Sequence, residues 1–214
     1  MASYNAEKIR SSLKLRSEEE RELIANKILE SKPDPNAPTW IFGYGSLMWN
    51  PEINYTRSLV GTLQGFQRKF CFWSVLGRGT PENPGLMMGL WQGGECTGAL
   101  FCLPRSTERE ELDKLVYREC RWGVYIPRWL PVKTEESDVT ALVFTVDRTH
   151  PVMVGDLPEN EVVHYLATAE GSRGSSRDYL FNTLEEMKKL GIFDEPIEKL
   201  GEKVQAYPIE QRLR

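Results

Sequence analysis

The chain contains the run Trp40-Ile41-Phe42-Gly43-Tyr44-Gly45-Ser46-Leu47-Met48-Trp49-Asn50-Pro51. The residues at its start favour a β-strand, and the two glycines that follow permit backbone angles and close approaches that are closed to other residues. The run therefore predicts a short buried strand that breaks into a glycine-bracketed loop. The N–H groups of Gly45, Ser46 and Leu47 can converge on a carboxylate or an oxyanion in such a loop; a tight turn or bulge without a ligand is the alternative.

Strand patterns extend from this run to residue 146. The expected strands are 39–43, 58–64, 67–75, 86–92, 96–103, 124–133 and 139–146, divided by glycine and proline turns such as 77–85. The chain has 214 residues, of which 40% are hydrophobic. That length and composition are sufficient for one well-packed domain.

Helices are expected on both sides of this strand-rich block. On the N-terminal side, Ser17 and Glu20 have the spacing of a capping box. A stripe at helical spacing follows, formed by Leu23, Ile24, Ile28 and Leu29, and the proline-rich stretch 32–38 ends that helix. After residue 158, two apolar faces at helical spacing consist of Val162, Val163, Leu166 and Ala169, and of Leu180, Leu184, Met187 and Leu190, with Gly191 as the expected C-cap.

One more helix is expected inside the strand-rich block. Thr107 and Glu110 have the spacing of a capping box, and the apolar stripe that follows consists of Leu112, Leu115 and Val116. Glu119 lies seven, four and three residues after those positions, so its carboxylate is expected on the apolar side, where a low dielectric suits a carboxyl group to proton transfer near neutral pH. The alternatives are that the helix ends at Arg118, or that Glu119 forms an ordinary ion pair with Arg118 or Arg121.

Composition excludes several classes of function. The net charge is −4 and the 27 basic residues are spread along the chain, which argues against nucleic acid as a partner. No apolar stretch approaches the roughly 18 residues that span a bilayer, and the N-terminus lacks the apolar core of a signal peptide. We therefore expect a cytoplasmic protein that does not associate with membranes.

The cysteine and histidine content narrows the chemistry further. The four cysteines, Cys71, Cys96, Cys102 and Cys120, lack the spacing of a zinc site and are expected to be reduced, although Cys96 and Cys102 would face the same side of an extended strand and could form a disulfide. The two histidines, His150 and His164, are expected to be structural. Ser-His-Asp, Cys-His and multi-histidine metal chemistries therefore lack the residues that they need.

Three motifs together give the chain a family resemblance. They are the run 40–51, the stretch Gly77-Arg78-Gly79-Thr80-Pro81 with Asn83-Pro84-Gly85, and Tyr117-Arg118-Glu119. In these motifs the chain resembles the ChaC family of glutathione-specific γ-glutamylcyclotransferases, and the bacterial branch in particular, from about residue 38 to 191. The resemblance implies an α+β fold, with a small mixed β-barrel or strongly curved sheet and flanking helices. The implied division is an N-terminal helix and linker (1–38), a γ-glutamylcyclotransferase domain (39–191) and a C-terminal helical extension packed on the same domain (192–214).

The resemblance also implies a reaction and a site. The α-amine of the γ-glutamyl group of glutathione would attack its own side-chain carbonyl, giving 5-oxoproline and Cys-Gly, with Glu119 as general acid and base. Neither a cofactor nor a metal is needed. The implied substrate-binding residues are Ile41, Phe42, Gly43, Tyr44, Gly45, Ser46 and Leu47 for the γ-glutamyl group, together with Arg78 and Tyr179.

Some positions depart from the family pattern. Leu86 stands where related sequences often carry arginine, and Ser172 and Ser176 replace a Gly-Pro...Asn pattern. These departures affect the selectivity for the peptide more than the type of reaction. Two alternative functions stay open: a cyclotransferase for other γ-glutamyl amino acids or amines, and a non-catalytic regulator of cation transport. The oligomeric state is not predicted.

Overall fold

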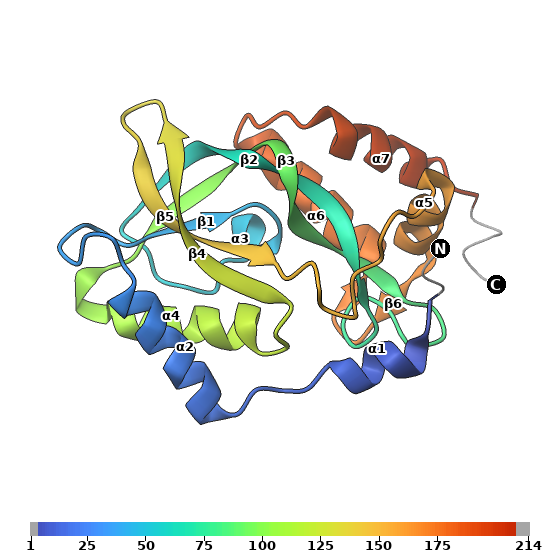
Figure 1. Ribbon diagram of the computed structural model, residues 1–214. Helices are drawn as coiled ribbons and strands as arrows, with labels where there is room; N and C mark the ends of the chain where they lie inside the picture. The colour runs from blue at the N-terminus through green and yellow to red at the C-terminus, as the bar shows by residue number, and fades with distance from the viewer. Residues whose placement is uncertain (1–3, 209–214) are drawn as a thin grey trace. The chain divides into compact units, whose positions relative to one another are not determined.

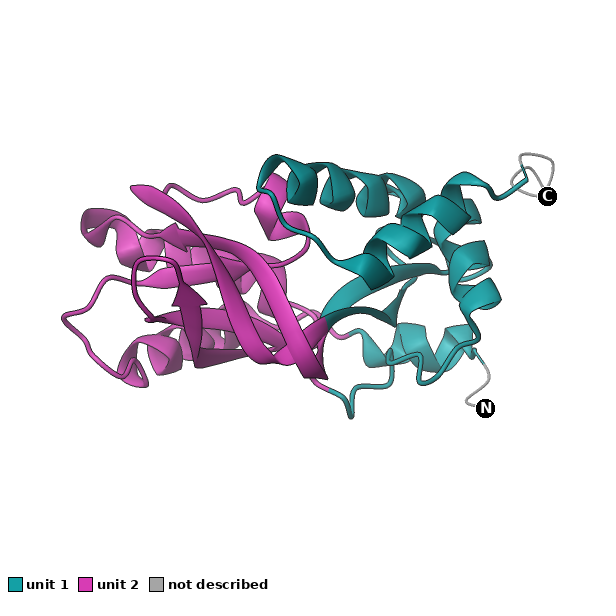
Figure 2. Ribbon diagram, turned by 90° about the horizontal axis from the view of Figure 1, so that it is seen from above, with its two compact units in different colours: residues 1–13, 68–89, 148–214 teal, residues 14–67, 90–147 magenta. Residues whose placement is uncertain are grey.

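The computed structural model describes residues 4–208, which fall into two compact units. Of the described residues, unit 1 contains 4–13, 68–89 and 148–208, and unit 2 contains 14–67 and 90–147 (Figure 2). Each unit is therefore built from segments that are distant in the sequence. No helix in the described part of the chain is long and apolar enough to cross a membrane.

Five strands form a closed barrel in the order β1-β3-β2-β4-β5. The strands are β1 (Trp40–Gly43), β2 (Arg57–Ser74), β3 (Gly85–Cys102), β4 (Tyr125–Thr134) and β5 (Val139–Val146) (Figure 1). Strand β1 pairs antiparallel with β3 and parallel with β5, with Phe42 opposite Leu100 and Val143 respectively. The mixed barrel implied by the family resemblance is thereby confirmed.

Two pairs of expected strands turn out to be single strands. The ranges 58–64 and 67–75 both lie in β2, and 86–92 and 96–103 both lie in β3. Gly65, Gly93 and Gly94 have φ values of 82°, 113° and 66°, the left-handed region that glycine adopts without steric cost. These glycines distort the two long strands without ending them.

The helices of unit 2 are α2 (Glu18–Glu30), α3 (Ser46–Trp49) and α4 (Glu108–Leu115), with a 3₁₀ turn before α4 (Arg105–Thr107) and a π-helical turn after it, η2 (Val116–Cys120).

The capping box of Ser17 and Glu20 is confirmed. The expected stripe of α2 is partly wrong, because Leu23 is 53% exposed whereas Ala25 is fully buried beside Ile28. The expected capping box at Thr107 is also wrong: the 3₁₀ turn already includes Thr107, whose side chain makes no capping hydrogen bond.

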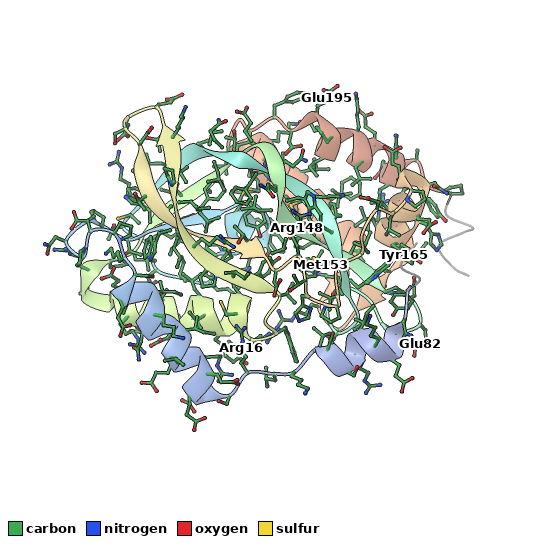
Figure 3. The ribbon with its side chains drawn as sticks, in the orientation of Figure 1. Arg16, Glu82, Arg148, Met153, Tyr165 and Glu195 are labelled. Atoms are coloured by element: carbon green, nitrogen blue, oxygen red, sulfur yellow. The ribbon has the colours of Figure 1, made fainter. Side chains whose placement is uncertain are left out.

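The helices of unit 1 are α1 (Ala6–Ser12), α5 (Glu159–Thr168), α6 (Ser176–Lys189) and α7 (Glu195–Gln205), and a short hairpin, β6 (Glu170–Gly171) and β7 (Gly174–Ser175), separates α5 from α6. Helix α7 packs on α5 and α6. The expected C-cap is confirmed, because Gly191 has φ 68° and the N–H of Ile192 donates to the carbonyl of Met187 at 2.8 Å, as in a Schellman motif. Met153, which is half-buried and labelled in Figure 3, forms an isolated bridge with Phe72.

Candidate active site

The loop after β1 is buried and folds back tightly. Tyr44 is 5% exposed, and Gly43 and Gly45 are buried. A Cβ atom at Gly43 would lie 3.0 Å from the Cβ of Leu47, so glycine is needed for this close approach. Beyond the loop, Ser46 and Leu47 open helix α3, and the first N–H groups of a helix have no partner within it.

The side chains of the loop have different surroundings. Those of Ile41 and Phe42 are completely buried, and that of Leu47 is 5% exposed, so these three are core residues whose backbone alone is suited to contact a ligand. The Tyr44 hydroxyl donates to the carbonyl of Phe144 at 2.8 Å. Its proton is therefore engaged within the protein, whereas the half-buried Ser46 directs its hydroxyl oxygen to an arginine, described below.

Glu119 lies in the π-helical turn that continues helix α4. Leu112, Leu115 and Val116 are buried as expected. An α-helix would place residue 119 next on this stripe, but the wider π turn places Cys120 there instead, fully buried. Glu119 consequently lies at the edge of the stripe, with a side chain that is 12% exposed.

Arg118 links Glu119 to the glycine loop. Its Nε lies 3.0 Å from Oε1 of Glu119, and its Nη2 donates to the Oγ of Ser46 at 2.9 Å. Its Nη1 donates to the carbonyl of Asn50 and lies 3.2 Å from Oε2 of Glu52. Of the alternatives open at the sequence level, the ion pair with Arg118 is therefore present. The guanidinium of Arg118 thus contacts both the glycine loop and the Glu119 carboxylate within unit 2.

A second carboxylate on the same helix is fully buried. Glu111 accepts hydrogen bonds from the N–H of Asn54 at 3.0 Å and from its side-chain amide at 2.8 Å, and it pairs with Lys114 at 3.1 Å. Burial acts to raise the pKa of Glu111, but these partners outweigh it and hold the pKa below its usual value. Glu111 is thus a fixed structural anion, which the sequence analysis did not identify.

In unit 1 the structure brings Arg78 and Tyr179 together. The Arg78 guanidinium carbon lies 5.6 Å from the centre of the Tyr179 ring, and Nη1 donates to the carbonyl of Ser175 at 3.4 Å. Burial lowers the pKa of the Arg78 guanidinium, whereas Tyr179 and Asp178 act in the opposite direction. Tyr179 itself is 2% exposed.

The three residues that depart from the family pattern, Leu86, Ser172 and Ser176, contribute to packing or to backbone hydrogen bonds. The hydroxyl of Ser176, which is fully buried, donates to the carbonyl of Arg78 at 3.0 Å, and that of Ser172 donates to the carbonyl of Leu76 at 2.8 Å. Leu86 is completely buried. Both serines therefore fix the backbone of the glycine-rich connection that carries Arg78.

The cysteines and histidines take no evident part in the site. All four cysteines are free, as expected, and burial raises the pKa of both Cys71 and Cys120 to about 12. His150 accepts a hydrogen bond from the N–H of Val152 at 3.3 Å, and His164 lies 2.7 Å from the Tyr207 hydroxyl. Within residues 4–208, no group of three or more metal-binding side chains is found.

The central position of Arg118 was not predicted from the sequence, where this residue was considered only as an ion-pair partner of Glu119. The sequence did contain a signal, because Arg118 directly precedes the candidate base. Its contacts with Ser46, Asn50 and Glu52, however, join segments about 70 residues apart, and these contacts depend on the fold.

The fold is that of the γ-glutamylcyclotransferases. A crystal structure of a glutathione-specific γ-glutamylcyclotransferase from yeast matches with a TM-score of 0.73 and 21% identity, covering 82% of this chain and 99% of that chain. The family described as ChaC-like protein matches residues 39–207, and the chain belongs to this family.

Two curated relatives carry the same activity in their names. The glutathione-specific γ-glutamylcyclotransferase of Escherichia coli is 40% identical over 86% of this chain and 80% of its own length. Glutathione-specific γ-glutamylcyclotransferase 1 of Danio rerio is 34% identical over 70% of this chain and 79% of its own length.

Proposed function

We propose that this chain is a lyase that cleaves glutathione to 5-oxoproline and Cys-Gly. The observation that carries the proposal is the arrangement in which Arg118 contacts both Glu119, at 3.0 Å, and Ser46 of the glycine loop, at 2.9 Å. Through Arg118, the Glu119 carboxylate is tied to the loop whose backbone N–H groups suit an anion. The 40% identical relative from Escherichia coli supports glutathione as the substrate.

The reaction needs little from the protein except positioning and proton transfer. The α-amine and the γ-carbonyl belong to one molecule, so a folded γ-glutamyl group supplies much of the acceleration. Glu119 takes a proton from the α-ammonium, and the amine nitrogen attacks the γ-carbonyl carbon to form a tetrahedral intermediate. Collapse of that intermediate breaks the bond to the cysteinyl nitrogen, which receives the proton from Glu119. The ring nitrogen still carries two hydrogens at that point, and it passes one of them through the Glu119 carboxylate to the Cys-Gly amine, which leaves as an ammonium.

The glycine loop supports the proposal because converging backbone N–H groups favour an anionic ligand. The N–H groups of Gly45, Ser46 and Leu47 are proposed to meet an anionic group of the substrate, either the α-carboxylate or the oxyanion of the intermediate. We further propose that the reaction takes place in the cytoplasm, because the four free cysteines suit the reducing compartment in which glutathione keeps thiols reduced.

The direct test is incubation of the purified protein with glutathione, with 5-oxoproline and Cys-Gly followed by mass spectrometry. We expect both products in equal amounts. Parallel reactions with γ-Glu-Ala test the breadth of the substrate range, and we expect slower turnover. A folded protein without turnover of either peptide would contradict the enzymatic function and leave the regulatory alternative.

Arg78 is proposed to attract a carboxylate of the substrate. Replacing Arg78 by Met removes the charge but keeps much of the side chain that packs over Tyr179. A charge-assisted hydrogen bond is worth about 1.5–3 kcal/mol, so KM for glutathione should rise roughly 10- to 100-fold while kcat changes little. Steady-state kinetics measures both values. Arg173→Met, a nearby exposed arginine, is the control, and an unchanged KM in the Arg78 variant would remove this residue from the binding site.

A further inference from the structure

The segment before the matched family region packs on the helix that carries Glu119. Residues 14–32, here called the brace, contain helix α2, which contacts both α4 and the π-helical turn η2 (Figure 1). The brace also makes polar contacts with α4 and β4: Lys32 pairs with Glu108 at 2.9 Å, and Trp129 donates to the carbonyl of Ile28 at 3.0 Å. The brace lies outside residues 39–207, the range that the family model matches.

The first residues of the brace meet the end of the turn that contains Glu119. The backbone N–H of Arg16 donates to the carbonyl of Arg121 at 2.9 Å, and its Nη1 donates to the carbonyl of Cys120 at 2.9 Å. Figure 3 labels Arg16 where the chain leads into α2. Carbonyl groups at a helix end have no partner within the helix, so Arg16 satisfies two groups that directly follow Glu119.

Two further contacts fix this arrangement. Arg21 donates to the carbonyl of Arg16 at 2.6 Å, and its guanidinium carbon lies 5.1 Å from the centre of the Tyr117 ring, within the range of a cation–π interaction. The brace therefore contacts the chain on both sides of Glu119: at Tyr117 before it, and at Cys120 and the C-cap residue Arg121 after it.

Gly123 makes room for the arginine. Its φ of 75° is in the left-handed region, and a Cβ atom there would lie 3.3 Å from Nη2 of Arg16. Its N–H donates to the carbonyl of Cys120 at 3.1 Å, the same carbonyl that accepts from Arg16. The backbone after Glu119 is thus shaped around the guanidinium.

We propose that the brace sets the position of Glu119, with Arg16 as a positioning residue that acts through the carbonyl groups of Cys120 and Arg121. A π-helical turn is an irregular piece of helix that is common at functional sites, and its last carbonyls are held here by another segment of the chain. Arg16 neither donates the reacting proton nor binds substrate. This inference rests on the proposed role of Glu119.

The test compares Arg16→Ala with the wild type and with Lys14→Ala, which removes an exposed cation two positions earlier. Displacement of a reacting group by about 1 Å can cost about 100-fold in rate. We expect kcat to fall roughly 10- to 100-fold in the Arg16→Ala variant, with KM for glutathione nearly unchanged. Arg16→Lys keeps the positive charge and a hydrogen-bond donor group and should recover part of the loss, whereas Lys14→Ala should resemble the wild type.

Native-state hydrogen exchange gives a measurement that does not depend on activity. Amides of residues 116–123 should exchange at least about 10-fold faster in the Arg16→Ala variant, while the barrel strands keep their protection. If that variant does not fold, Arg21→Ala removes the contact with the Arg16 carbonyl, and it should give the same changes in smaller measure. Wild-type kcat and wild-type exchange would overturn the inference. A wild type without turnover would refute the proposed function instead, and the exchange rates alone would then decide whether the brace holds the turn.

Discussion

Replacement of Glu119 by Gln is expected to lower kcat about 10²- to 10⁴-fold, the range for loss of a general base. The amide keeps the size and shape of the side chain but cannot accept the proton of the α-ammonium. Binding should survive, because the backbone of the glycine loop is unchanged. Quenched-time-point assays of 5-oxoproline measure kcat, and calorimetric titration with glutathione measures binding.

The control is Glu111→Gln, since Glu111 is a glutamate of the same helix with no proposed part in the chemistry. Its carboxylate is fully buried and accepts two hydrogen bonds from Asn54. Loss of its charge should lower the free energy of unfolding by about 1–3 kcal/mol, with little change in kcat. Glu119→Gln should thus lose catalysis and keep its stability, whereas Glu111→Gln should lose stability and keep its kcat. If Glu119→Gln keeps activity within a few-fold of the wild type, the base lies elsewhere.

Replacement of Arg118 by Met is expected to lower kcat/KM about 10- to 100-fold. The variant loses the contact that holds Oε1 of Glu119 and the hydrogen bond to Ser46, so both the base and the loop lose their anchor, and small misplacements of reacting groups are costly. Steady-state kinetics gives the size of the effect. The control is Arg57→Met, which removes an arginine from the ion pair with Glu136. Both side chains of that pair are more than half exposed. Because surface pairs of this kind contribute little to stability, this variant should keep kcat/KM near the wild-type value.

A double-mutant cycle shows whether Arg118 acts through the loop. Ser46→Ala alone should reduce kcat/KM, whereas the same change in the Arg118→Met background should cost less, because the hydrogen bond that it removes is already lost. Interacting neighbours show coupling of about 0.5–3 kcal/mol. Strictly additive effects would mean that Arg118 and Ser46 act independently, and that Arg118 does not connect the loop to Glu119.

Local patterns in the sequence were enough to predict most of the elements. Ser17 caps α2 and Gly191 ends α6 as expected, because capping depends on a few neighbouring residues. Predictions failed where tertiary structure overrides the local pattern. Gly65, Gly93 and Gly94 resemble turn residues, but cross-strand pairing carries β2 and β3 through them.

The sequence singled out Glu119 as a candidate but could not foresee the geometry around it. Helical periodicity identified Glu119 as unusual, because a carboxylate was expected on an apolar face. Periodicity assumes 3.6 residues per turn throughout, so it could not foresee the π turn that gives the buried position to Cys120. The contacts of Arg118 with Ser46 and of Arg16 with Cys120 join segments that only the fold brings together.

The π turn affects the reactivity of the Cys120 thiol toward oxidised glutathione. By burying Cys120 next to Glu119, it leaves that thiol with a pKa of about 12, so almost no thiolate forms at physiological pH. Thiol–disulfide exchange requires the thiolate as the attacking species. Burial by the π turn therefore makes the Cys120 thiol, beside the proposed base, a poor nucleophile toward the disulfide of oxidised glutathione.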